Sequence, residues 1–292
     1  MSASGQNAIS QFTNYTSRSP IAACRLNHDD LKKIYQILED RQKEVRQRVV
    51  DLQVQQQNET PEIFEDRKRR VYEAYVTSVT INATDGQAIT GHSEDIFTNP
   101  NVPEQITSIL YSTASVPQAL LGLLPIDRAT VFLDFTRPPL LNFRALPTLA
   151  TPNESNFEVT GSTEAWVTAL YTRLSKMFSD RRAPFEWLHR PGIYDVLLAI
   201  FGIPFALWVD YHVEKIINHK DWASIFSTAV YVYFFILALN LFRVLFSYTR
   251  WLFPKIEFSD QTSSPVKHRV VWGALVVGVM AAMIWDIIKA LA

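Results

Sequence analysis

The 292-residue chain carries 28 basic and 29 acidic side chains, a net charge of −1, so its total charge does not indicate a nucleic acid or another highly charged partner. Its single cysteine excludes an intramolecular disulfide and a cysteine-based zinc site within one chain. The charges gather in the first two thirds of the chain, whereas long stretches after residue 196 carry almost none. This segregation predicts a water-soluble part followed by a membrane part.

Residues 1–23 are polar and lack the apolar stretch of a signal peptide, so we expect a disordered tail there. Polar capping residues then open a helix at Asn27. An apolar residue recurs every seven positions along this helix, at Leu31, Leu38, Val45 and Leu52. The stripe predicts packing on a sheet, and a dimeric coiled coil remains an alternative, although Arg41 and Arg48 interrupt its second seam.

The rest of the soluble part alternates strand and helix patterns. Residues 65–70 mix two acids with four bases, which is typical of a solvated helix end. Strands are predicted at 71–81, 87–90, 129–135 and 155–160, with a tight turn at Asp85-Gly86. Helices are predicted after Pro103, in its favoured first-turn position, and after Gly161. The order predicts an α+β domain over residues 24–190, with a mostly antiparallel sheet and helices in two layers.

Residues 191–292 predict an all-α transmembrane domain of about three helices, with spans near 194–212, 223–243 and 270–288. The first apolar run is short, with 14 residues between Asp195 and Asp210, and Pro204 is expected to kink it. A re-entrant or interfacial first segment, with only two spans after it, is therefore the alternative.

The distribution of basic residues predicts orientation. Five basic residues lie between 173 and 190, two lie between the first and second spans, and five lie between 243 and 269. The positive-inside rule then places the soluble domain and the second connection in the cytoplasm, which requires the first segment to cross. We expect a plasma membrane protein, most simply one of a bacterial inner membrane.

Several residues in the membrane part are candidates for helix packing. Ala274, Gly278 and Ala282 repeat every four residues, a pattern that allows helix backbones to approach closely, either within one chain or between copies. Three further polar residues are expected within the membrane or at its interface: Asn240, Arg243 and Asp286.

No phosphate-binding loop, nucleophile elbow or metalloprotease motif occurs, so we predict no catalytic, cofactor or metal site. His212 and His219, with Asp210 and Glu214 nearby, imitate a metal cluster but fit a solvated membrane surface. His189 and Asp195 bracket the junction with the membrane part, as a proton switch or as anchors at the headgroups. Asp134 is the candidate functional carboxylate, since it ends an apolar strand; pairing with Arg137 is the alternative.

These features predict a non-enzymatic membrane sensor or effector. Its cytosolic domain would recognise a protein or small ligand and control an oligomeric bundle of membrane helices, an architecture similar to that of bacterial defence effectors. The expected partners are the lipid bilayer and further copies of the chain, with no cofactor and no nucleic acid. The alternatives are a membrane-tethered adaptor and an enzyme with an unfamiliar site near Asp134.

Overall fold

A computed structural model describes residues 14–103, 105–140, 147–217, 224–260 and 265–291, and the statements below concern these residues. The chain divides into two compact units. Unit 1 comprises Met1–Asp134, Glu154–Arg182 and Phe258–Gln261, and unit 2 comprises Phe135–Asn153, Ala183–Glu257 and Thr262–Ala292. We expected one boundary near residue 190, whereas the chain passes between the units five times.

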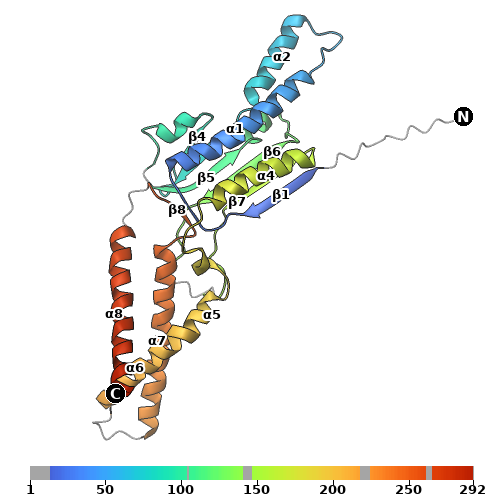
Figure 1. Cartoon of the computed structure of the whole chain (residues 1–292). Coiled ribbons are helices and arrows are strands. Elements are labelled where there is room, and N and C mark those ends of the chain that lie inside the picture. Colours follow the sequence, from blue (N-terminus) through green and yellow to red (C-terminus); the bar gives the residue numbers. More distant parts are fainter. Residues whose placement is uncertain (1–13, 104, 141–146, 218–223, 261–264, 292) are drawn as a thin grey trace, which may run out of the picture. The chain divides into compact units, whose positions relative to one another are not determined.

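Unit 1 is built on a six-stranded sheet in the order β1-β7-β6-β5-β3-β4, and every pair of neighbours is antiparallel (Figure 1). The strands are β1 (Tyr15–Pro20), β3 (Ser78–Ala83), β4 (Ala88–Gly91), β5 (Ile106–Ser112), β6 (Arg128–Asp134) and β7 (Asn156–Gly161). A short strand, β2 (Cys24–Leu26), pairs with β8 (Ile256–Phe258), whose last residue belongs to unit 1.

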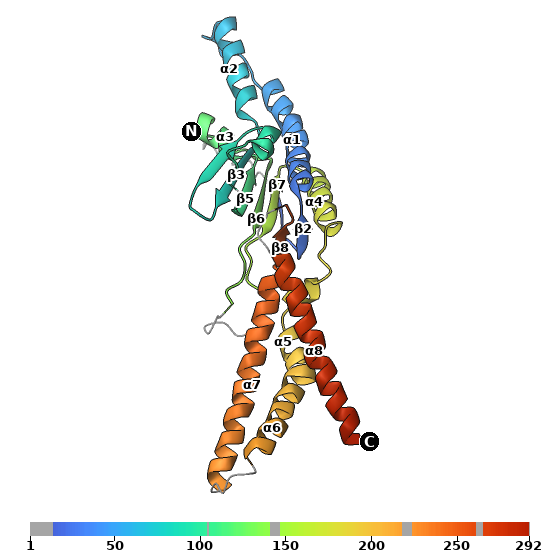
Figure 2. The ribbon, with the colours of Figure 1, turned by 90° about the vertical axis from the view of Figure 1, so that its left-hand side faces the viewer.

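Helices α1 (His28–Asp51) and α4 (Glu164–Ser179) cover one face of this sheet, as Figure 2 shows. Alternate strand residues point into the layer between, where Ile109, Val131 and Leu133 are fully buried. Burying one such side chain contributes about 1.5–3 kcal/mol. The remaining helical elements of unit 1 are α2 (Pro61–Ala74), α3 (Ser115–Leu121) and a 3-10 turn (Glu94–Thr98). The predicted two-layer α+β domain is confirmed.

Helix α1 begins as predicted. The Asn27 side chain accepts a hydrogen bond from the Asp30 amide at 2.8 Å, and the Asp30 carboxylate accepts one from the Asn27 amide at 3.1 Å. This reciprocal cap satisfies two amides that a helix start leaves without partners. Val45 is the last buried residue of the apolar stripe, whereas Leu52 is 71 % exposed. Leu52 lies just past the end of α1, on the segment that leads to α2.

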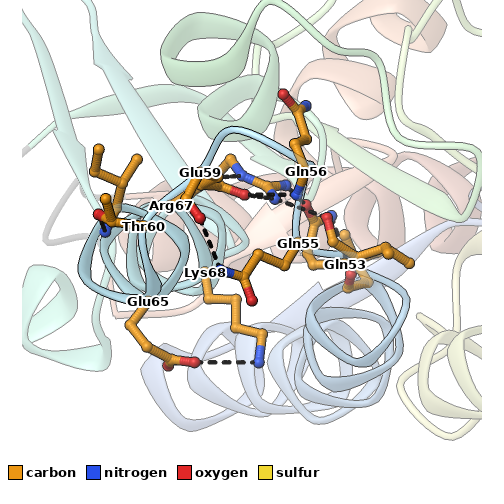
Figure 3. A network of polar contacts seen from close by, with 11 residues as sticks. Gln53, Gln55, Gln56, Glu59, Thr60, Glu65, Arg67 and Lys68 are labelled. Atoms are coloured by element: carbon orange, nitrogen blue, oxygen red, sulfur yellow. Dashed lines mark hydrogen bonds and ion pairs between the residues drawn. The ribbon is translucent and has the colours of Figure 1, made fainter.

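A polar network organises this α1–α2 connection (Figure 3). The Arg67 guanidinium donates to both carboxylate oxygens of Glu59, each at 2.9 Å, and to the Val54 carbonyl at 3.0 Å. The hydrogen bonds from Arg67 lower the pKa of Glu59 to about 2. The basic run at 67–70 thus lies inside α2 and not at a helix end, and its side chains pair with acids of the same hairpin.

Three secondary-structure predictions were wrong. Residues 71–74 continue α2, because Val71 and Ala74 face inward at helical spacing. Residues 15–20, expected in a disordered tail, form the edge strand β1, whose pairing with β7 uses the backbone and needs no apolar pattern.

The helix predicted after Pro103 is strand β5. The pairing of β3 with β5 shifts register between Asn82 and Ala83, so that Ile106 and Ile109 both point inward although they lie three residues apart. Such a bulge mimics the helical period, and only the pairing of β5 with β3 and β6 reveals the difference.

Two segments of unit 1 that continue into unit 2 meet the chain at the start of α1. There the Arg25 amide donates to the Arg181 carbonyl at 3.0 Å, and the Ser259 amide donates to the Leu26 carbonyl at 2.8 Å. Asp260 accepts from the backbone amide of His28 at 2.8 Å and contacts its Nδ1 at 2.7 Å. Partial burial raises the pKa of Asp260, but the hydrogen bonds from His28 outweigh it and the net shift is downward.

Unit 2 contains three helices that are long and apolar enough to cross a membrane, at Ile193–Lys215, Ile225–Leu252 and His268–Asp286. The first combines α5 (Ile193–Leu197), a π-helix (Leu198–Gly202) and α6 (Ile203–Ile217); the others are α7 (Ser224–Leu252) and α8 (Pro265–Leu291). The first span has 23 residues, or roughly 35 Å at helical rise, so it is long enough to cross. Its π-helix ends at Gly202, two residues before Pro204, where we expected a kink.

The π-helix and α7 pack at Gly202. A β-carbon added there would lie 2.9 Å from Cδ1 of Phe242 on α7 and 2.7 Å from Cδ1 of Leu198. In contrast, α7 and α8 separate from one another toward their far ends in Figure 2. No described residue from His268 to Asp286 on α8 is buried.

Candidate functional site

The most elaborate polar arrangement in unit 2 surrounds Arg250, near the C-terminal end of α7. The side chain is only 7 % exposed, and its guanidinium lies 4.6 Å from the ring centroid of Phe246. Its Nε donates to the Leu188 carbonyl at 3.1 Å, and its Nη1 donates to the carbonyls of Pro147 at 3.0 Å and Leu149 at 3.1 Å. We call residues 147–151, 188–190 and 246–253 the collar.

The collar explains how non-helical backbone is accommodated at the end of an apolar helix. Residues 147–151 lie in irregular structure, where carbonyl groups have no partner within a helix or a sheet. A buried carbonyl without a hydrogen bond costs about 1–3 kcal/mol. Arginine offers five N–H donors in a planar fork, so Arg250 alone can satisfy acceptors from two separate segments.

His189 joins the same two segments. Its Nδ1 lies 2.9 Å from the Thr151 hydroxyl, and its carbonyl accepts from the Thr151 amide at 3.3 Å. Burial lowers the pKa of His189 to about 4, and the nearby charges of Arg250 and Lys255 act in the same direction. His189 is therefore neutral near pH 7 and stays so well into the acid range.

This buried histidine predicts a loss of stability in acid. Above about pH 6.5, the ordinary value, His189 is neutral in both the folded and the unfolded chain and adds no pH dependence. Between that value and about pH 4 only the unfolded chain takes up the proton. The free energy of unfolding therefore decreases by about 3 kcal/mol over this range. The temperature of thermal unfolding in detergent should therefore decrease more steeply in the wild type than in His189→Gln as the pH is lowered from 6.5 to 4. A His92→Gln control, at an exposed histidine, should follow the wild type; equal slopes for all three proteins would contradict the assignment.

Helix α8 is attached beside the collar. Arg269, in its second turn, donates from Nη2 to the Leu252 carbonyl at 2.8 Å and to the Glu257 carboxylate at 2.7 Å. The Tyr248 hydroxyl on α7 lies 3.0 Å from Nδ1 of His268. The Trp272 ring packs edge-on against Tyr248, as is common for aromatic residues at a membrane interface.

The predicted junction residues meet at one loop. Asp195 accepts a hydrogen bond from the Thr148 hydroxyl at 3.1 Å, and His189 binds Thr151, so both are held by residues 148–151. Arg137 lies with its guanidinium 4.8 Å from the Trp251 ring. The carboxylate of Asp134 accepts from the Glu154 amide at 3.3 Å, an arrangement that holds the end of β6 near the start of β7.

The polar residues predicted on α7 behave differently from one another. Asn240 is exposed and donates to the Ile236 carbonyl of its own helix at 2.9 Å. Arg243 is half-buried, one turn further along α7.

The small-residue face of α8 is exposed in the part of the chain that the structure describes. Ala274, Gly278 and Ala282 are all exposed, and a β-carbon added at Gly278 would meet nothing within 4 Å. The helix packing or oligomerisation predicted for this repeat stays a prediction.

Asp286 contacts α6. Its Oδ2 accepts a hydrogen bond from Nε1 of Trp208 at 2.8 Å and lies 3.5 Å from Nε2 of His212. His219, the other histidine considered as a metal ligand, lies outside the described residues. Among the described residues no group of three or more histidine, cysteine or acidic side chains could hold a metal ion.

Sequence reasoning counted Arg250 only as a positive charge that indicates orientation, and it missed Thr151 altogether. One signal was present. An arginine in the last turns of an apolar helix, four residues beyond Phe246, has a high free-energy cost of burial unless its guanidinium has hydrogen-bond partners. Its partners, however, are backbone carbonyls about 60 and 100 residues away in sequence, and no sequence pattern identifies those.

Comparisons with known proteins returned no relative: no family model, no curated protein and no solved structure matches this chain.

Proposed function

We propose that the protein is a membrane-embedded sensor or effector: unit 1 recognises a protein, and the membrane helices assemble with those of further copies. The observation that carries this proposal is α8. An apolar helix of 27 residues is held to its own chain by polar contacts near its two ends, while the small-residue face between them is open.

Small residues allow close helix crossings in lipid, where apolar burial gives no driving force. Unit 2 leaves this face of α8 unused, and the exposed Asn240 on α7 adds a side-chain amide that can hydrogen-bond to another helix. Both features support a second copy as the partner of these helices.

The collar supports a coupling role. The segment bound by Arg250 at Pro147 and Leu149 lies in the connection between β6 and β7, and Leu188 follows α4 in the chain. A displacement of the start of β7 or the end of α4 on partner binding would therefore move segments that are bonded to the end of α7. Collar and α8 are in turn joined through Arg269.

Unit 1 offers an apolar recognition surface beside the second half of α1. Leu120, Leu123, Leu124 and Ile126 are all between 45 % and 68 % exposed, on α3 and the loop that follows it. The ion pair of Arg48 with Asp127 at 2.6 Å places this loop beside the second half of α1. Soluble surfaces seldom group exposed aliphatic residues in this way unless they bind a partner.

The distribution of basic residues supports unit 1 on the cytoplasmic side of a plasma membrane, as in a bacterial inner membrane. Defence against infection is one setting in which such an effector would act, by analogy of architecture alone.

Cysteine crosslinking in membranes tests the assembly. In a Cys24→Ser background, Ala274→Cys and Ala282→Cys should form disulfide-linked dimers, whereas Val276→Cys, on the opposite face of α8, should not. Ion flux into liposomes should accompany assembly. Equal crosslinking from both faces, or none from either, would contradict the proposal.

A tethered adaptor is the second candidate, and the exposed leucines of unit 1 favour it equally. Leu123→Asp should abolish capture of a partner in detergent in either case. Flux from the wild type in liposomes separates the two functions, because an adaptor gives none.

A further inference from the structure

The end of α7 and the start of α8 share a group of aromatic rings. The Trp251 ring stacks on Tyr248 at a centroid distance of 5.8 Å, and it meets the His268 ring edge-on at 6.2 Å. The Trp272 ring packs edge-on against Tyr248 at 5.3 Å, and the Tyr248 hydroxyl lies 3.0 Å from Nδ1 of His268. We call these four residues the aromatic cluster.

The aromatic cluster marks a surface of the membrane. The second span ends at Leu252 and the third begins at His268, and the contacts of the cluster join these two ends. Both ends therefore lie at the same surface of the bilayer. Tryptophan and tyrosine are enriched in the layer of lipid headgroups, so the cluster lies at the depth of the lipid phosphate groups.

Two arginines lie beside the aromatic cluster. The Arg137 guanidinium lies over the Trp251 ring, 4.8 Å from its centroid, and Arg269 directly follows His268 on α8. Burial lowers the pKa of Arg137; the Glu257 carboxylate raises it, and the Arg269 guanidinium lowers it. These three charged groups are therefore close enough to act on one another. Two guanidinium groups and one carboxylate leave a net charge of +1.

We infer that Arg137 and Arg269, with the aromatic cluster, bind the phosphate group of an anionic membrane lipid. A lipid phosphodiester carries a single negative charge, which complements the net charge of the three groups. A guanidinium can bind phosphate through two parallel N–H donors, and stacking on a ring leaves these donors at the rim of the planar fork. A lipid phosphate, unlike a soluble one, is always present at this depth of the membrane.

The two arginines differ in what else they hold. Arg269 donates to the Leu252 carbonyl and to the Glu257 carboxylate, so its removal would also loosen the attachment of α8 to the end of α7. Arg137 belongs to the segment that follows β6, outside the three spans. A substitution at Arg137 should therefore change lipid binding while the spans and the attachment of α8 stay in place.

A lipid titration of the full-length chain in detergent tests the inference. Native mass spectrometry resolves the chain with each successive bound lipid, so it gives a dissociation constant for the first phosphatidylglycerol and for the first phosphatidylcholine. We expect the wild type to bind phosphatidylglycerol more tightly. Arg137→Gln should weaken this binding about fivefold, which corresponds to about 1 kcal/mol for one basic residue at a membrane surface. Its affinity for phosphatidylcholine should not change.

Lys289→Gln is the matched control. The Lys289 ammonium lies 5.5 Å from the Trp285 ring, so this variant removes the same charge from a cation–aromatic pair near the other end of α8. Its affinity for phosphatidylglycerol should equal that of the wild type. Arg137→Lys keeps the charge but lacks the planar fork, so its affinity should fall between those of the wild type and Arg137→Gln.

Three results would overturn the inference. The first is equal binding of the two lipids by the wild type, and the second is a loss in Lys289→Gln as large as that in Arg137→Gln. The third is displacement of phosphatidylglycerol by millimolar glycerol phosphate, which would assign the site to a soluble phosphate. The measurement needs neither oligomers nor ion flux, so its outcome is independent of the proposed function.

Discussion

Replacing Arg250 by methionine should destabilise the protein more than any other single substitution in unit 2. Methionine keeps the apolar stem of the side chain but removes the donors that serve the carbonyls of Leu188, Pro147 and Leu149. One buried and two part-buried acceptors left without these donors should cost roughly 2–4 kcal/mol in total. Thermal unfolding in detergent should then occur roughly 10 °C lower.

The matched control is Arg190→Met, in the same collar. Arg190 is exposed and forms a 3.5 Å ion pair with Glu186, one turn away, which is worth at most about 1 kcal/mol. Arg250→Lys should fall between the two variants, because one ammonium cannot reach all three carbonyls in the planar geometry of a guanidinium. If Arg250→Met unfolds at the temperature of the Arg190→Met control, the collar does not hold these segments to α7.

Gly278→Leu should dissociate oligomers while leaving membrane insertion intact. Leucine is favourable in hydrocarbon, so the span still inserts, but it is too large for a close crossing of small residues. A β-carbon at Gly278 would meet no described atom within 4 Å, so leucine should cause no steric clash within the single chain. Crosslinking in native membranes should therefore show a loss of dimers and higher species, with unchanged amounts of membrane-bound chain.

Gly273→Leu provides the control within the same helix. It also has open space around it, but it lies five residues from Gly278, or about 140° around the helix. Oligomers should survive this change. Gly202→Leu should instead damage the single chain, since its side chain would overlap Phe242 on α7. A wild-type protein that is monomeric at native expression, or an oligomer that Gly278→Leu leaves unchanged, would favour the adaptor.

The elements that depend on local physics could be read from the sequence. A membrane span needs about 20 apolar residues in one helix, because every backbone group must be paired within the segment, and so all three spans were predicted. The cap at Asn27 and the alternation along 129–135 are likewise local features, and both are present.

Other features were settled only when distant segments met. Strand β1 exists because β7 offers it a partner, and β5 carries a bulge that gives its sequence a helical spacing. The role of Arg250 depends on carbonyls supplied by loops that have no pattern of their own. The sequence left two uses for the small residues of α8, and the packing of unit 2 leaves their face open. A sequence records which groups need partners, but the partners available to them are determined by the tertiary structure.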